Sequence, residues 1–156
     1  MTERFTCQIQ FARHDPGFAE DLGSIDASEF RETFRGVDWS IEADRLAFVG
    51  KAWPGICVTN TESGMKLWMA AYRALPPDFL DKDEFSEMMA IWYVMKVENA
   101  IAVPNVANIL DGCDLASAHF ETWEIEAVEE LFDLFFCEDL ENLYSRLFKM
   151  ERANFA

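Results

Sequence analysis

The sequence predicts an α+β fold, and three observations support this prediction. An alternating apolar run near the N-terminus and a pair of apolar runs at 55–72 predict a small antiparallel sheet. The C-terminal third instead repeats its apolar residues at helical spacing. Hydrophobic residues make up 51% of the 156 residues, which is enough for a packed core. We therefore expect residues 1–156 to form a single domain in which helices cover the sheet and the C-terminal third is helical.

Two elements are expected near the N-terminus. Apolar and polar residues alternate over 5–11, and this period of two with one polar face predicts a half-buried strand. The segment His-Asp-Pro-Gly at 14–17 predicts the turn that ends the strand. Asp26 can cap a short helix over 27–35, which a glycine ends. The apolar residues of 38–49 follow no single period, so the structure of that stretch stays open.

The clearest local motif is a hairpin. Its strands are the apolar runs 55–60 and 65–72, and the loop 61–64 between them ends in a glycine. Gly64 can supply the positive φ that such a turn often needs. Pro76-Pro77 then breaks the chain, since neither proline can donate to a strand ladder or lie inside a helix.

The middle of the chain permits two interpretations. Apolar residues at helical spacing favour a helix over 81–98, which we predict. The runs 91–97 and 101–103 also suit strands, so 83–98 stays open between a helix and a pair of strands. A further short helix is expected over 104–110, with a proline in its first turn. The residues that support the longer helix are Phe85, Met88, Met89, Trp92 and Met95.

The C-terminal third predicts two amphipathic helices or one bent helix. Thr122 can cap the first, which extends to Phe136 and has glutamates in its first turn, where the helix dipole favours anions. The second starts near 138–139 and carries basic residues at its end. The inward faces are expected to consist of Ile125, Val128, Leu131, Phe132 and Phe135 in the first helix and Leu140, Leu143, Tyr144, Leu147 and Phe148 in the second.

One sign of charge dominates the same region. From Val97 to Ser145 the sequence has twelve carboxylates and no lysine or arginine, and the whole chain carries a net charge of −16. Such a field repels nucleic acid and anionic membranes, and it attracts a basic partner. Solubility or a salt-adapted host is the competing explanation of the charge.

A row of acids on the first C-terminal helix gives this charge a candidate site. Glu126, Glu130 and Asp133 follow at i, i+4 and i+7, with Glu129 beside them. Neighbours on such a face lie about 5–6 Å apart, and phosphates along a DNA strand lie about 6–7 Å apart. We expect the row to be exposed, either to meet an arginine- and lysine-rich surface or as a solvated face. The predicted partner-binding residues are Glu126, Glu129, Glu130, Asp133, Glu138 and Asp139.

The sequence contains no motif of catalysis or cofactor binding. Glycine-rich phosphate loops and nucleophile elbows are missing, and the thirteen basic residues are too scattered for a nucleic-acid surface. His119 lies near Cys113 without the spacing of a metal site. The four cysteines form no CxxC pair and lie in apolar contexts, so we expect buried, free thiols. Without a secretory signal or a membrane span, we expect a cytoplasmic protein with no metal, cofactor or catalytic residues.

Large aromatic rings are the remaining feature. Trp53 precedes the hairpin, Trp68 and Tyr72 lie within it, and Trp92 follows it. Tryptophan and tyrosine are enriched at interface hot spots, but they are also ordinary core residues. We expect most of these rings in the core.

These observations favour a non-enzymatic acidic binding protein that inhibits a partner by blocking its basic, nucleic-acid-acting surface. In size, acidity and class, and in no motif, the chain is similar to immunity proteins that neutralise bacterial toxins. It is similar in the same way to phage inhibitors of defence nucleases, including anti-CRISPR and DNA-mimic proteins. That resemblance implies a basic protein partner and no direct contact with nucleic acid or membrane. The alternatives are a small cytoplasmic α+β enzyme or small-molecule-binding domain with its cleft beside the hairpin, and an interaction domain whose acidity serves solubility alone.

Overall fold

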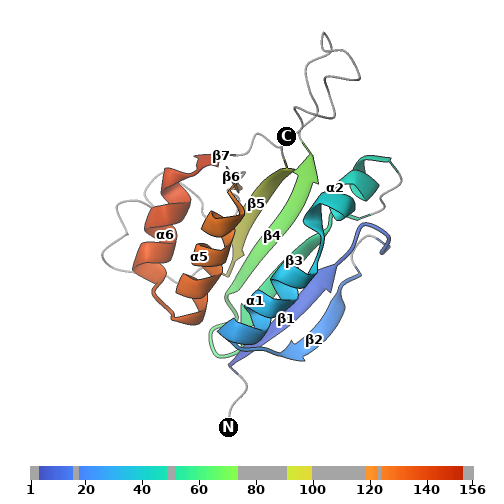
Figure 1. Ribbon diagram of the computed structural model, residues 1–156. Coiled ribbons are helices and arrows are strands. Elements are labelled where there is room, and N and C mark those ends of the chain that lie inside the picture. Colours follow the sequence, from blue (N-terminus) through green and yellow to red (C-terminus); the bar gives the residue numbers. More distant parts are fainter. Residues whose placement is uncertain are drawn as a thin grey trace.

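The computed structural model of the chain describes residues 4–15, 18–48, 52–73, 91–99, 119–122 and 124–152 (Figure 1). In chain order the elements are β1 (Phe5–Gln10), β2 (Glu20–Ser24), α1 (Ala27–Gly36), α2 (Trp39–Phe48), β3 (Gly55–Asn60), β4 (Lys66–Arg73), β5 (Ile91–Glu98), β6 (Phe120–Thr122), α5 (Ile125–Phe136), α6 (Leu140–Lys149) and β7 (Glu151–Arg152).

The described strands form one seven-stranded sheet in the order β2-β1-β3-β4-β5-β6-β7. All neighbouring strands in it are antiparallel. The four described helices lie on one side of this sheet, α1 and α2 as one pair and α5 and α6 as a second pair beside it (Figure 1). The predicted α+β class is confirmed, as are the N-terminal strand and the hairpin of β3 and β4. The sheet is larger than the predicted one, because β2 adds at one edge and β5, β6 and β7 add beyond the hairpin.

Residues alternate between the two faces of the central strands, as the period of two requires. On β1, Phe5, Cys7 and Ile9 are buried, and the polar residues between them are half-buried. The hydrophobic core lies between this first face of the sheet and the helices. The apolar strand residues buried there are Phe5, Cys7, Ile9, Ile56, Val58, Leu67, Met69, Ala71, Tyr93, Met95, Val97 and Phe120.

The intervening strand residues form the second face of the sheet, and no described helix lies over it (Figure 1). This face is polar at β1 and richer in apolar side chains on β4 and β5. Most of its side chains are half-buried. Its residues are Thr6, Gln8, Gln10, Gly55, Cys57, Thr59, Lys66, Trp68, Ala70, Tyr72, Trp92, Val94, Lys96, Glu98 and Glu121.

Aromatic packing joins the two helix pairs. Phe30 and Phe34 of α1 are buried, and the ring centroid of Phe30 lies 4.3 Å from that of Phe132 on α5. The predicted cap of α1 is confirmed: the Asp26 side chain accepts a hydrogen bond from the Glu29 backbone N–H, and the Glu29 side chain accepts one from the Asp26 backbone N–H. On α5 the buried residues are the predicted Val128, Leu131, Phe132 and Phe135.

The predicted helix over 81–98 is wrong for residues 91–98, which form strand β5. All eight residues of β5 pair with β4, from Lys66 opposite Glu98 to Arg73 opposite Ile91. The competing strand interpretation holds for 91–97. The stretch 38–49, which the sequence left open, contains helix α2.

Apolar side chains on both faces explain the error at β5. Tyr93 and Met95 point into the core, and Trp92 and Val94 lie on the second face, so alternation is lost from the sequence. The other predicted segments here, 81–90, 101–103 and 104–110, lie outside the described residues.

The C-terminal helices are separate rather than one bent helix. Glu138 adopts a left-handed backbone conformation, with φ of 57°, in the turn between them. Asp139 then caps α6 by accepting a hydrogen bond from the Asn142 backbone N–H at 3.3 Å. The predicted cap at Thr122 is wrong: this residue ends β6, and α5 begins three residues later. Its hydroxyl oxygen instead accepts a hydrogen bond from the Glu124 backbone N–H at 3.1 Å.

Candidate functional site

The predicted row of acids lies on one helix, α5, as expected. Glu126 and Glu130 are exposed, whereas Glu129 and Asp133 are half-buried. The prediction that all four are exposed is therefore wrong for Glu129 and Asp133. The physical reason is that arginine side chains of α1 lie against them.

Two arginines of α1 form ion pairs with this row. Arg35 donates from Nε to Glu129 Oε1 and from Nη2 to Glu129 Oε2, both at 2.9 Å. Arg31 Nη2 lies 2.6 Å from Asp133 Oδ2. The hydrogen bond from Arg35 holds the pKa of Glu129 below its ordinary value, and the same bond raises the pKa of the Arg35 guanidinium. The carboxylates of α5 thus fasten α1 to α5.

Two further predicted residues also have partners within the chain. Glu130 pairs with Arg146 of α6. Glu138 pairs with Arg4, and its Oε1 accepts a hydrogen bond from Asn60 Nδ2 at 2.9 Å. The Glu138 carboxylate, after the end of α5, therefore contacts both Arg4, just before β1, and Asn60, at the end of β3.

The structure gathers the six predicted residues along α5 and the turn to α6, but most serve the fold. Four have arginine partners, and Asp139 is a helix cap. Glu126 is the one that forms neither an ion pair nor a cap within the described part of the chain. The row therefore presents less negative charge than the sequence indicates, because the arginines come from outside the acidic region.

A second acidic surface lies along β2 and α1, and the sequence analysis missed it. The arginines of α1 face α5, and at 3.6 residues per turn Glu29 and Glu32 project away from the arginines toward solvent. Both are exposed. Edge strand β2 leads directly into this helix and carries the exposed Glu20 and Asp21. These four residues form what we name the β2–α1 acidic surface. Its signal in the sequence was the spacing of Glu29 and Glu32, which repeats at i, i+3.

A cavity of about 490 Å³ lies on the second face of the sheet. This volume falls within the range of small-molecule sites, which are mostly apolar with a few placed polar groups. The hairpin strands β3 and β4 contribute to it, and so do β1 and β5. The lining residues are Gln10, Trp53, Gly55, Trp68, Met69, Ala70, Val94, Lys96, Glu98 and His119.

The register of the strands gives the cavity its shape. Gly55, Ala70 and Val94 lie side by side on β3, β4 and β5. Their short side chains form a low floor. On β4 the floor residue is flanked at two residues' distance by Trp68 and Tyr72, which point to the same face. The result is a hollow between ring side chains.

Ring and polar contacts lie at the two ends of this hollow. At one end, Trp53 lines the cavity and packs on Tyr72, with the ring centroids 5.4 Å apart. Tyr72 is not a lining residue, and its Oη donates a hydrogen bond to Glu121 Oε2 at 2.6 Å. Burial, together with this hydrogen bond, raises the pKa of Tyr72, so the phenol stays protonated at neutral pH. At the other end, Lys96 Nζ lies 3.5 Å from Glu98 Oε1, and both side chains are about one-third exposed.

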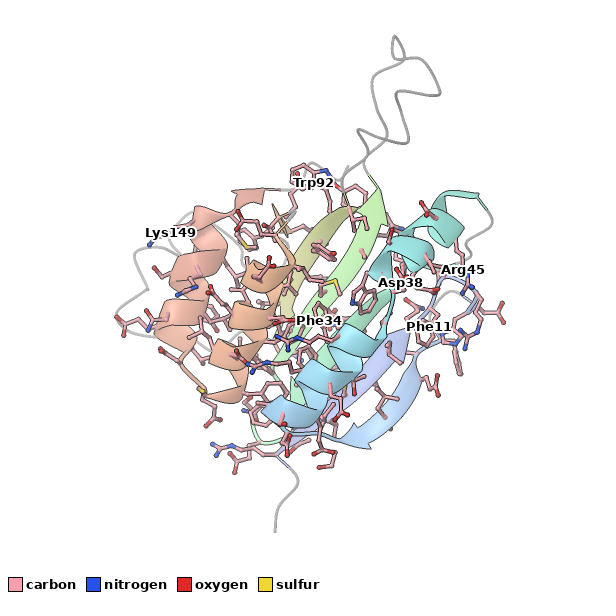
Figure 2. All side chains as sticks on the ribbon, in the orientation of Figure 1. Phe11, Phe34, Asp38, Arg45, Trp92 and Lys149 are labelled. Atoms are coloured by element: carbon pink, nitrogen blue, oxygen red, sulfur yellow. The ribbon has the colours of Figure 1, made fainter. Side chains whose placement is uncertain are left out.

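The tryptophan rings of this region are not core residues. Trp53 is 42% exposed, and Trp68 and Trp92 are half-buried on the second face; Trp92 is labelled in Figure 2. The prediction that most of these rings are in the core is wrong because they project away from the helix-covered side. The indole N–H of Trp68 is buried and has no hydrogen-bond partner.

Three described cysteines are free thiols. Cys7 and Cys57 are buried, and burial raises the pKa of each to about 12. Cys137 is exposed because it is the C-cap of α5, so its expected burial is wrong. Cys113 lies outside the described residues.

The described residues contain no group of three or more His, Cys, Asp or Glu side chains placed to hold a metal ion. A search of the described helices finds none with the length and apolar character needed to cross a membrane. The fold and its surfaces define an acidic α+β protein with one helix-covered and one aromatic sheet face. No protein-family model, curated protein or solved structure matches the chain. Its function is therefore inferred from its own surfaces.

Proposed function

We propose that this chain is a non-enzymatic acidic binding protein of the cytoplasm that inhibits a partner by covering its basic surface. A protein that acts on nucleic acid has such a surface, and carboxylates can occupy it in place of phosphates. Toxin immunity proteins and phage anti-defence proteins, including anti-CRISPR and DNA-mimic proteins, are the classes with this profile.

The observation that supports the proposal most is a net charge of −16 on a chain in which six of the thirteen lysines and arginines form ion pairs within the described residues. Ion pairs within the chain use Arg4, Arg31, Arg35, Arg45, Lys96 and Arg146. The excess carboxylates produce a negative field that steers a basic partner toward the protein. At physiological salt this field reaches about 8 Å from the surface.

The protein has two acidic surfaces that a basic partner could contact. On α5, a basic partner can contact Glu126 directly. The neighbouring acids Glu129, Glu130 and Asp133 already pair with arginines of this chain, so the partner has to displace those arginines to contact them. On the β2–α1 acidic surface, the four carboxylates form no ion pair within the described part of the chain. We propose that both surfaces contact the basic partner. The first consists of Glu126, Glu129, Glu130, Asp133, Glu138 and Asp139, and the second is the β2–α1 acidic surface.

A pull-down from host extract at low and at high salt tests the proposal. We expect a basic, nucleic-acid-acting protein to be retained at low salt and released at high salt. The purified partner should be inhibited at a one-to-one ratio, without turnover of any substrate by this chain. A partner whose activity is unchanged by saturating amounts of the chain would rule out inhibition.

Charge-reversal variants locate the contact. Glu126→Lys tests α5, and Glu20→Lys with Glu32→Lys tests the β2–α1 acidic surface. Glu62→Lys, at the exposed hairpin loop, is the matched control. We expect at least one of the first two proteins to associate about tenfold more slowly, because exposed charges steer encounter. Equal association rates for all of them would show that the acids are only a solvated surface.

A small-molecule-binding domain or small enzyme is the second candidate function. The cavity beside the hairpin favours it, because its volume and mainly apolar lining match those of ligand sites. This candidate does not depend on the acidic surfaces, which lie elsewhere on the fold.

A further inference from the structure

We infer that the cavity on the second face of the sheet binds an uncharged, flat heteroaromatic molecule with a hydrogen-bond acceptor at its edge. The inference rests on the second candidate function and is independent of the first. Three properties of the cavity point to this ligand class: its shape, its polar groups and its charge.

The shape suits a flat ring. Neighbouring residues on one face of a strand are about 7 Å apart, so a ring placed over Ala70 has Trp68 on one side and Trp53, which packs on Tyr72, on the other. Aromatic rings interact at centroid separations of about 4.5–7 Å, which this spacing permits. Gly55 and Val94 continue the floor to either side, and a bulky or branched molecule would not lie flat on it.

The polar groups favour a ligand that is able to accept and donate hydrogen bonds. The indole N–H of Trp68 is buried without an acceptor, and buried donors are normally paired. Solvent does not reach this nitrogen, so the Lys96–Glu98 pair is the polar group that an incoming ligand meets at the cavity. Lys96 is the cross-strand neighbour of Trp68, and with Glu98 it offers a donor and an acceptor at the rim.

The charge balance favours an uncharged ligand. Lys96 and Glu98 compensate each other at 3.5 Å, so the rim itself prefers neither sign. The net charge of −16 repels an anion from the whole molecule. A cation gains little at the rim, because the Lys96 ammonium group offsets the attraction of the Glu98 carboxylate. An uncharged heteroaromatic ring satisfies all three conditions.

A panel of matched probes tests the inference on the full chain. The uncharged members are indole, quinoline, benzimidazole and adenine, and each is paired with a carboxylate derivative of the same ring. Tryptophan fluorescence and ligand-observed NMR report binding. We expect at least one uncharged probe to bind saturably, one per chain, and about tenfold more tightly than its carboxylate. If no uncharged probe binds below about 1 mM, or if the carboxylates bind more tightly, the inference is wrong.

Two ring-adding variants show whether a bound probe occupies this cavity. Ala70→Phe fills the floor, and Thr6→Phe adds the same ring to the same face outside the cavity. Probe binding should be lost in Ala70→Phe and retained in Thr6→Phe, with both proteins folded by circular dichroism. Retained binding in Ala70→Phe would overturn the site. If the parent is a dimer by light scattering and Ala70→Phe is a monomer, a second copy of the chain occupies this face instead.

These outcomes are separate from those of the inhibition test. The probes carry no positive charge and the readout needs no partner protein. Loss of the basic partner in the charge-reversal variants leaves the probe result unchanged, and failure of the probes leaves the partner result unchanged.

Discussion

Arg35 and Glu129 lie fork to fork, with two parallel hydrogen bonds of 2.9 Å between residues 94 positions apart in the chain. Bidentate, charge-assisted pairs of this kind are stronger and more directional than single contacts. This pair holds α1 against α5 at the margin of the aromatic core. One consequence is that a carboxylate expected to bind a partner stabilises the fold.

Replacing Glu129 with glutamine should lower the free energy of unfolding by about 1 kcal/mol at pH 7. Because the folded pKa of Glu129 is depressed, the stabilisation is fully present above the unfolded pKa of about 4.3 and is lost as the pH falls through the lower folded value. Urea unfolding of both proteins from pH 7 down to pH 3 measures the difference, which should shrink only below about pH 4.3. Glu126→Gln is the control, and its free energy of unfolding should stay close to that of the parent at every pH. A difference between Glu129→Gln and the parent that does not depend on pH would contradict the stabilising role of the ionised Glu129 carboxylate.

Replacing Gly55 with alanine should destabilise the protein by about 1–3 kcal/mol or more. A Cβ at this position would lie 2.3 Å from the Met69 carbonyl oxygen, which is backbone and cannot turn away. Gly36→Ala is the matched control, because a Cβ there meets nothing within 4 Å. That change should be neutral or stabilising by about 0.4–1 kcal/mol. Thermal unfolding of both variants decides, and equal melting temperatures would disprove the close approach.

Replacing Trp68 with phenylalanine should change the free energy of unfolding by less than about 1 kcal/mol, because the indole N–H has no hydrogen bond to lose. Trp39 provides the comparison. Its Nε1–H donates to the Phe34 carbonyl oxygen at 3.2 Å in the core, so Trp39→Phe loses a bond and leaves an acceptor unpaired. We expect that variant to lose about 1–3 kcal/mol. A larger loss for Trp68→Phe than for Trp39→Phe would show that the Trp68 nitrogen has a partner.

The thiols should differ in reactivity with a disulfide reagent at pH 8. Cys137 is exposed and should react fast. Cys7 and Cys57 are buried with pKa values raised to about 12, so almost no thiolate forms and both should react only on unfolding. Peptide mapping by mass spectrometry assigns each modified residue. Rapid modification of Cys7 in the folded protein would show that the first face of the sheet is accessible.

The sequence predicted the elements whose pattern is local. The cap at Asp26, the hairpin and the inward face of α5 follow from local patterns, and the structure confirms them. The prediction for residues 91–98 was wrong because apolar residues occupy both faces of strand β5, and such a continuous apolar run cannot be told from a buried helix by its period. Strands β2, β6 and β7 are short or polar, and only their pairing with neighbours makes them strands.

The candidate sites were less accessible to sequence reasoning, because they depend on contacts between distant segments. The acidic row was read from a region without basic residues, yet Arg4 reaches Glu138 across 134 positions. The cavity depends on a register that brings Gly55, Ala70 and Val94 together. The alternative function placed a cleft beside the hairpin, and the cavity is lined by residues of both hairpin strands.

The acidic residues of β2 have a further consequence for how copies of this chain behave toward one another. β2 is the outermost strand at one edge of the sheet, and its outer backbone groups have no strand beside them in the described structure. Charged side chains on such an edge prevent another strand from adding to it. Glu20 and Asp21 supply such charges at this edge, and both are exposed. The residues that face a basic partner therefore also keep copies of this chain from joining sheet to sheet.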